Sequence, residues 1–434
     1  MVKAMYRCKF YLIFLVVLTV PYSAASAEEV LTWQDCIKEA ALNHPDLIAA
    51  QDVVKESEAS KRITASTLFP QITSDVSASR SKAAVTGGGG GNFPAQTTNS
   101  FSYEVTGSQL IFDGFKTVNN VKASQETIKA SQQSYRYTSS QVRLRLRTAF
   151  ANLLYAQQLG LVTEDIVKIR KDNLGLIKLR YQSGLEHEGA LLTAEANLAQ
   201  AEFQAAQAQR DVGLVQRQLT KEMGRTEFVP MTAKGDFTVI NAEEQMPDFE
   251  ALAKDNPSLL QLVAQKNAAA FSLKSTYGNF FPSLSVSGGA GKTGDHWAPS
   301  NNEWDAGLTV SFPLFEGGER LAQVDQAKAT LNQLGENERS EKDSVVVTLQ
   351  QEWVSLEDAI GTVDVQKKQL AAAQERSEIA NVEFSTGFMN YDNWTIIEDN
   401  LVQAKTGYLS AQVNALLAEA NWIAAKGEKL EYVQ

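Results

Sequence analysis

The stretch FPSLSVSGGAGKTGDHWAPSNNEWDAGLTVSFP, residues 281–313, decides the fold, because it contains two runs of alternating polarity. Leu284 and Val286 alternate with serines, and from Trp304 to Phe312 every second residue is apolar. Strict alternation places one set of side chains on each face of a strand. The residues between the runs are rich in glycine, serine and asparagine, which is typical of a hairpin loop. The stretch therefore predicts an antiparallel pair of amphipathic strands at about 282–313.

This stretch has an earlier counterpart, so the chain holds two copies of one unit. The matched positions are Pro45 with Pro257 and Pro70 with Pro282, both 212 residues apart, then Phe112 with Phe315 and Gly184 with Gly387, both 203 apart. The offset changes once, across a segment that contains the glycine run 87–91. The copies therefore differ in the length of one loop, and a tandem duplication explains the pattern.

The duplication divides the chain into segments of predicted structure. These are a signal peptide at 1–27, a first repeat at 28–224, an equatorial linker at 225–250, a second repeat at 251–427 and a tail at 428–434. Each repeat is expected to hold a short helix, a strand pair and a long helical hairpin. The first strand pair is predicted at about 70–112, and the two hairpins at about 116–224 and 319–427.

The hairpin segments show helical spacing and contain no proline. Val142, Leu146 and Phe150 recur at four-residue steps, as on one face of a helix. A helix over residues 116–180 would be about 98 Å long at ~1.5 Å per residue. Gly184 and Gly387 follow the two long helices, where a left-handed residue is favoured. The shorter returning helix has small residues such as Ala194, Ala201 and Ala208, which permit close packing against a neighbour.

The N-terminus and the composition limit where the protein can be located and what it can bind. Residues 1–27 have a basic start, an apolar run and a small-residue cleavage site, Ala25-Ser26-Ala27, as a secretory signal does. Removing them leaves 37 basic and 51 acidic side chains, a net charge of −14, which argues against nucleic acid as a partner. Cys36 is then the single cysteine, so no disulfide forms within the chain. No later stretch is apolar for long enough to be a transmembrane helix.

The predicted elements cannot form a stable protein from one copy. Four strands are too few for a closed barrel, since small closed barrels have about eight. An open sheet edge is not viable in lipid. Helices near 100 Å long cannot fold into a globule either, so they are expected to lie side by side as a bundle or a tube. If the strands cross a membrane, several copies must complete one cylinder.

The duplicated motifs resemble those of the TolC-like outer membrane efflux proteins. The resemblance rests on a proline that follows Asn43-His44 or Asp255-Asn256 before a helix, Phe-Pro at the start of a strand, Phe-(Asp/Glu)-Gly after the second strand, and (Tyr/Phe)-x-(Ser/Thr)-Gly at the hairpin tip. It covers nearly the whole mature chain. It implies an all-α long-helix periplasmic barrel continued by a transmembrane antiparallel β-barrel, with four strands per chain and twelve in a homotrimer. It also implies a location in the outer membrane that extends into the periplasm.

The resemblance further implies what the protein does and with what it assembles. The channel would passively conduct substrates from an inner membrane transporter and a periplasmic adaptor protein to the outside, in tripartite efflux or type I secretion. It would be in contact with outer membrane lipid, would need no cofactor, and would not be an enzyme. Drugs, metals and proteins all remain open as cargo, because the partner pump selects the cargo.

Carboxylates at the hairpin tips are the candidates for a pore constriction. Glu186 and Glu188 follow Gly184, and Asp392 and Asn393 follow Gly387. Repeated by threefold symmetry, acidic residues would form rings that favour cations. Glu398 and Asp399, one to two turns further on, belong to the same acidic group. The alternative is that these are solvated turn residues.

The tip also departs from the family pattern. The positions aligned with the paired aspartates that form the constriction in the best-known member are Asn393 and Ile396, which are uncharged. This departure makes the turn with Glu186 and Glu188 an alternative candidate for the gate.

Two further sets of residues are candidates for contacts. The tip residues Gly184, Leu185, Gly387 and Phe388 are expected to meet the adaptor, although the glycines can serve only to close the turns. The candidates for lipid contact, as in an aromatic girdle, are Phe101, Tyr103, Trp304, Leu308 and Phe312.

Other function classes have weaker support. The three histidines show no zinc-like spacing, and the glycine run 87–91 lacks the Gly-Lys-Ser/Thr of a phosphate loop. A periplasmic enzyme therefore has no recognisable site in the sequence. A cell-surface coiled-coil structural or adhesive protein is the main alternative; sustained heptads without amphipathic hairpins would favour it.

Overall fold

The computed structural model describes residues 29–83, 96–239 and 245–430. The predicted signal peptide and the glycine run 87–91 lie outside the described residues. In the first half the main elements are α1 (Trp33–Asn43), α2 (Pro45–Ser66), β2 (Gln71–Ala83), β3 (Gln96–Phe112), α3 (Lys116–Gln182) and α4 (Glu188–Glu222). In the second half they are α5 (Phe249–Ala253), α6 (Pro257–Gly278), β5 (Ser283–Gly294), β6 (Asn301–Ser311), α7 (Glu319–Thr386) and α8 (Tyr391–Ala425).

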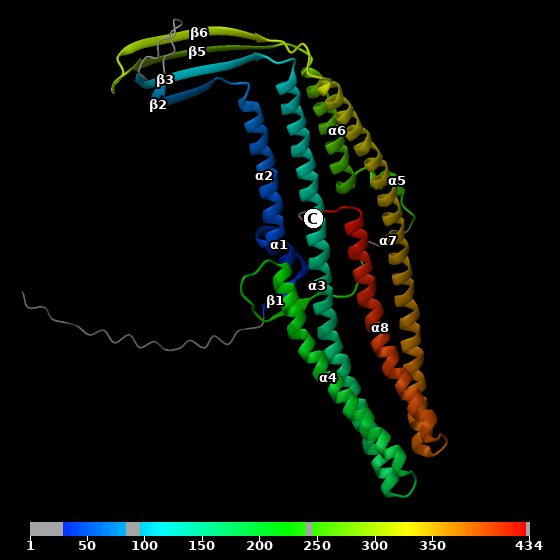
Figure 1. Ribbon diagram of the computed structural model, residues 1–434. Helices are drawn as coiled ribbons and strands as arrows, with labels where there is room; N and C mark the ends of the chain where they lie inside the picture. The colour runs from blue at the N-terminus through cyan, green and yellow to red at the C-terminus, as the bar shows by residue number, and fades with distance from the viewer. Residues whose placement is uncertain (1–28, 84–95, 240–244, 431–434) are drawn as a thin grey trace, which may run out of the picture.

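The two halves have the same arrangement and lie side by side (Figure 1). The long helices α3 and α7 have 67 and 68 residues, which makes each about 100 Å long at ~1.5 Å per residue. Near the sheet α3 packs against α2, and further down it packs against α4; α7 does the same with α6 and α8. Contacts of α3 with α6 and α8 join the halves. The result is a sheaf of helices with the sheet at one end and both hairpin tips at the other.

In each half, a proline and the residue before it separate two consecutive helices, α1 from α2 and α5 from α6. His44 and Asn256 adopt extended backbone conformations and cap the helices that begin at Pro45 and Pro257. The His44 Nδ1 atom accepts a hydrogen bond from the Asp46 amide at 3.2 Å, and the Asn256 Oδ1 atom accepts one from the Ser258 amide at 3.0 Å. Proline suits the first helical position, because its missing N–H needs no partner there.

The middle of the sheaf holds the main hydrophobic core. Val142, Leu146, Phe150 and Leu153 of α3 are all buried in it, which confirms the helical spacing of these residues. A parallel ribbon of β1 (Glu29–Thr32) and β4 (Met231–Lys234) covers this core. Leu430, at the end of the described chain, is also fully buried in it. The Leu430 amide donates to the Ser139 hydroxyl at 3.0 Å, so the C-terminal segment anchors the second half on the first.

Hydrogen bonds between charged side chains also stabilise the region around this core. Arg225 donates to Glu29 at 2.6 Å and also binds Glu39, and these hydrogen bonds from Arg225 lower the pKa of Glu29. Burial opposes ionisation of Glu222, but hydrogen bonds from Lys221 and Arg145 outweigh it and lower the pKa of Glu222. Burial raises the pKa of the lone thiol, Cys36, to about 12, so this thiol is inert at neutral pH.

The sheet joins the two halves through β3 and β5. Its strand order is β2-β3-β5-β6, and all three pairings are antiparallel. A register shift between Leu110 and Phe112 bends β3 where it leaves the sheet. β2 and β6 are the edge strands, and in the described part of the chain each pairs with a neighbour on one side only. Both edges therefore present unpaired backbone groups.

Candidate functional site: the hairpin tips and the faces of the sheet

The two hairpin tips are closed by glycines in the left-handed conformation. Gly184 has φ of 72° and Gly387 has φ of 85°, which confirms the expected left-handed positions. The following amides complete each closure: Leu185 donates to the Arg180 carbonyl at 2.9 Å, and Phe388 to the Glu383 carbonyl at 2.8 Å. As a result the Leu185 and Phe388 side chains project from the tips, 66% and 88% exposed.

The returning helices begin with side-chain caps directly after the tips. His187 Nδ1 accepts a hydrogen bond from the Ala190 amide at 3.0 Å, and Asn390 Oδ1 accepts one from the Asn393 amide at 2.9 Å. The carboxylates of Glu188 and Asp392 lie in the first helical turns, where the helix dipole favours negative charge. Both side chains are exposed, as is Asn393.

Three of the tip carboxylates make contacts within the chain. Glu186 is 11% exposed at its side chain and lies 3.8 Å from the Arg180 Nε atom. Glu398 is fully buried; Asn173 donates to it at 3.3 Å and Ser377 also binds it. Asp399 accepts a hydrogen bond from Arg170 at 2.6 Å. The expectation that Glu398 and Asp399 add free charge to an acidic ring is therefore wrong, because both instead join α8 to α3.

An aromatic stack in the second hairpin, which we did not predict from the sequence, packs against Arg180 of the first hairpin. The rings of Phe384 and Trp394 stack at 4.5 Å with an interplanar angle of 9°. The Arg180 guanidinium lies 4.5 Å from the Phe384 ring centroid and donates to the Phe384 carbonyl at 3.2 Å. Phe384 is the first residue of the second tip motif, and its counterpart Tyr181 is exposed. The motif marked the position but could not indicate that only one copy would be buried.

The sheet has one apolar and one polar face. Residues directly opposite each other in antiparallel strands share a face. The register therefore places four of the lipid-contact candidates on one face: Phe101 and Tyr103 of β3, and Trp304 and Leu308 of β6. Phe312 directly follows β6 and is exposed. An exposed apolar face of this kind indicates contact with a membrane or another protein.

The opposite face holds hydroxyl and carboxylate groups. Thr73 and Thr106 are hydrogen-bonded across β2 and β3 at 2.7 Å, as are Ser77 and Ser102. Thr293 donates to Glu303 across β5 and β6 at 2.6 Å. These cross-strand pairs show that the second face is hydrophilic.

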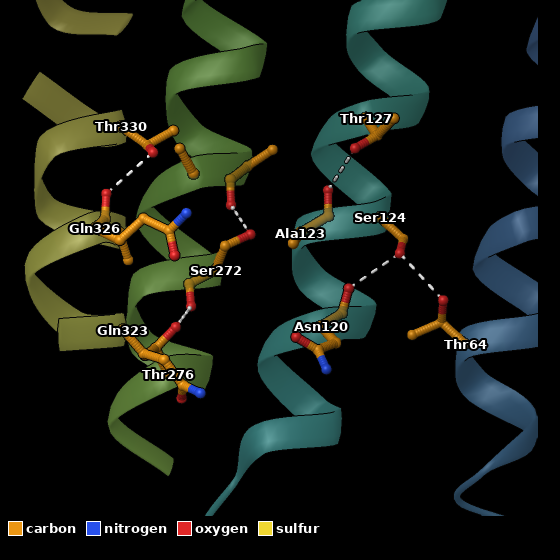
Figure 2. A pocket seen from close by; sticks show the side chains of 13 residues that line it. Thr64, Asn120, Ala123, Ser124, Thr127, Ser272, Thr276, Gln323, Gln326 and Thr330 are labelled. Atoms are coloured by element: carbon orange, nitrogen blue, oxygen red, sulfur yellow. Dashed lines mark hydrogen bonds between the residues drawn. The ribbon is translucent and has the colours of Figure 1, made fainter. Parts of the chain in front are cut away.

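A polar groove lies between the helices at the end of the bundle next to the sheet. Figure 2 shows the side chains that line it. It has a volume of about 890 Å³, and α2, α3, α6 and α7 all contribute to it. All thirteen lining residues are uncharged; the six with hydroxyls are Thr64, Ser124, Thr127, Ser272, Thr276 and Thr330. Each of these hydroxyls donates to a backbone carbonyl of its own helix, so the groove wall offers no charge and no free hydroxyl donor.

Two observations concern other kinds of site. Among the described residues, no group of histidine, cysteine, aspartate or glutamate side chains is placed to hold a metal ion. In the same part of the chain, no helix combines the length and the apolar composition needed to cross a lipid bilayer.

Comparisons with known proteins agree with the arrangement of elements. The family model described as outer membrane efflux protein matches residues 36–225 and 250–428. The outer membrane efflux protein BepC of Brucella suis is 23% identical over 365 residues, covering 82% of this chain and 76% of that protein.

Two solved structures extend this similarity to the fold. The CmeC outer membrane channel of Campylobacter jejuni has a TM-score of 0.80 and 18% identity, covering 92% of this chain and 87% of that one. The outer membrane protein VceC of Vibrio cholerae has a TM-score of 0.77 and 17% identity, covering 92% and 96%.

Proposed function

Because this chain belongs to the outer membrane efflux protein family, we propose that three copies assemble into one passive conduit across the outer membrane and the periplasm. The protein is located in the outer membrane, and its family is one of transport channels and not of enzymes. The conduit has no energy source of its own. It receives cargo from an inner membrane transporter through a periplasmic adaptor protein.

The observation that carries this proposal is the open, two-faced sheet. The outer edges of its two end strands, β2 and β6, have no pairing partner within the described chain, while one face is apolar and the other polar. Lipid cannot satisfy exposed backbone groups, so only a closed sheet is stable there. In three copies, β6 of each chain pairs with β2 of the next. A barrel of twelve strands results, with Phe101, Tyr103, Trp304, Leu308 and Phe312 toward lipid.

The helices extend the same cylinder into the periplasm. Each chain contributes four lengths of helix to the tube: α3, α7, α2 with α4, and α6 with α8. Three copies therefore place twelve around one axis, and α3 and α7 give the tube a length of about 100 Å. The uncharged groove of Figure 2 forms part of its wall. A wall without charged groups does not bind ionic cargo tightly.

The tips meet the adaptor and narrow the pore. The exposed side chains of Leu185 and Phe388 offer apolar contacts, and Gly184 and Gly387 hold them outward. Glu188 and Asp392, with the adjacent Asn393, supply the polar ring of the constriction. Glu186 contributes less, because Arg180 balances its charge.

Charge removal at the tips is expected to reduce cation selectivity. The double variant E188Q/D392N should lower the cation-to-anion permeability ratio about fivefold, since losing such rings changes the energy of a passing ion by about 1 kcal/mol. The reversal potential in a planar bilayer with a salt gradient measures this ratio. The matched control D325N/E336Q removes two exposed carboxylates of α7 far from the tips. An unchanged ratio in E188Q/D392N would place the constriction elsewhere.

Mass and conductance test the proposed function itself. The purified mature protein is expected to have the mass of three chains in detergent, and to conduct ions in a planar bilayer. A trimer without conductance, or a conducting monomer, would contradict the proposal.

A further inference from the structure

The charged residues of the four sheet strands are separated completely by sign. The acidic residues Asp75, Glu104, Glu303 and Asp305 all lie on the polar face. The basic residues Arg80, Lys82 and Lys292 all lie on the apolar face. The strands contain no other charged residue in the ranges that the structure describes.

Side-chain geometry supports the assignment of the acidic face. A Cβ atom at Gly289 would lie 2.6 Å from the Glu104 Oε1 atom and 2.7 Å from the Asp305 Oδ1 atom. The two carboxylates therefore meet above this glycine, on the side where Gly289 would project. Thr293 bonded to Glu303 lies on the same side.

Each of the three cations lies toward the end of its strand that is far from the helices. β2 leaves α2 at Gln71, so Arg80 and Lys82 are near its far end, and β5 likewise reaches Lys292 just before it ends. Lys292 is directly opposite Tyr103, and Phe101 follows one row further out. The cations are thus placed at the distal aromatic residues of an otherwise apolar face.

A charge on this face has no acidic strand residue with which to pair. The register puts every strand carboxylate on the other side, and symmetric copies would bring the same arrangement. The residues 84–95 between β2 and β3 include no acid. In the described β5–β6 turn, Asp295 is already bound to His296 at 2.7 Å. An anion that neutralises these cations must therefore come from outside the protein.

We propose that Arg80, Lys82 and Lys292 bind the phosphate groups of an anionic glycolipid in the outward-facing leaflet of the membrane. This rests on the proposed function, in which the apolar face contacts lipid and the far end of the sheet points away from the periplasm. Long basic side chains reach from an apolar surface to the headgroup level, and phosphate accepts their hydrogen bonds. The aromatic residues beside them suit the same interface.

Lipid binding by the purified full-length trimer tests this. The probe is a bis-phosphorylated, acylated glucosamine disaccharide added to the trimer in neutral detergent, with bound lipid counted by native mass spectrometry. The variant R80Q/K82Q/K292Q is expected to bind this lipid about a hundredfold more weakly, since each cation near a headgroup contributes roughly a factor of five. The dephosphorylated lipid should bind the wild-type trimer as weakly as the bis-phosphorylated lipid binds the variant.

The control K55Q/K328Q/R339Q removes the same number of exposed cations from the helices and should leave binding unchanged. Equal binding by both variants and wild type would overturn the proposal. Displacement of the lipid by inorganic phosphate at similar concentration would also overturn it, because the site would then serve a soluble anion. Conductance of the same samples is read separately, so a failure of lipid binding in a conducting trimer leaves the proposed function standing.

Discussion

The variant Leu308→Arg is expected to abolish assembly in the outer membrane. Leu308 lies on the apolar face, midway along the chain between the lipid-contact candidates Trp304 and Phe312, and is 68% exposed in the single chain. An arginine on the lipid face at mid-depth costs about 2–4 kcal/mol. Three copies per assembly bring this to roughly 6–12 kcal/mol, which is comparable to the whole stability of a typical domain. The amount of folded trimer in purified outer membranes measures the effect.

The adjacent residue provides a matched control. Thr309 lies on the polar face, paired with Ser285. Thr309→Arg introduces the same side chain one position further along the same strand, but into water. It is expected to assemble at close to the wild-type level. Equal loss in both variants would mean that the two faces of the sheet are not distinguished by lipid.

The variant Gly224→Ala is expected to cause the second large effect. Gly224 ends α4 with φ of 76°, and a Cβ atom there would lie 2.6 Å from the Asn43 carbonyl carbon and closer still to its oxygen. The left-handed conformation costs an L-residue about 1–2 kcal/mol, and the overlap with backbone adds about 1–3 kcal/mol. We expect the midpoint of thermal unfolding, followed by circular dichroism in detergent, to fall by about 5 °C or more.

Two other glycines separate the causes of this effect. Gly213 lies within α4, and a Cβ atom added there would meet nothing within 4 Å, so Gly213→Ala should be neutral or stabilising by up to about 1 kcal/mol. Gly184 shares the left-handed conformation but also has open space around it, so Gly184→Ala should show the conformational cost alone. A Gly224 variant no less stable than the Gly184 variant would show that the turn before α2 does not pack as described.

Local patterns in the sequence account for most of the fold. Alternation from Trp304 to Phe312 predicted β6 and its apolar face, since a period of two specifies both the strand and its orientation. Four-residue steps from Val142 to Phe150 predicted the buried side of α3. The glycines of the tip motif marked the ends of α3 and α7, because left-handed positions favour that residue.

Contacts between distant segments could not be predicted in the same way. Glu398 follows a tip motif, as a solvated carboxylate would, yet Asn173 and Ser377 on two other helices enclose it. Arg180 stacks on Phe384 across the two hairpins. Such pairings depend on how the helices pack against each other, and spacing along one helix does not determine which neighbour it meets.

Disulfide cross-linking between the two sheet edges tests the central claim most directly. One cysteine replaces Ser77 on β2, and a second is moved through the polar-face positions of β6, namely Glu303, Asp305, Gly307, Thr309 and Ser311. Within one chain these edges are three strand spacings apart, about 14 Å, which a disulfide cannot span. The native Cys36 is not expected to form a cross-link, because burial raises the pKa of its thiol to about 12. The account predicts covalent trimers on non-reducing gels at one β6 position or at two successive ones. Monomers at every position would contradict it.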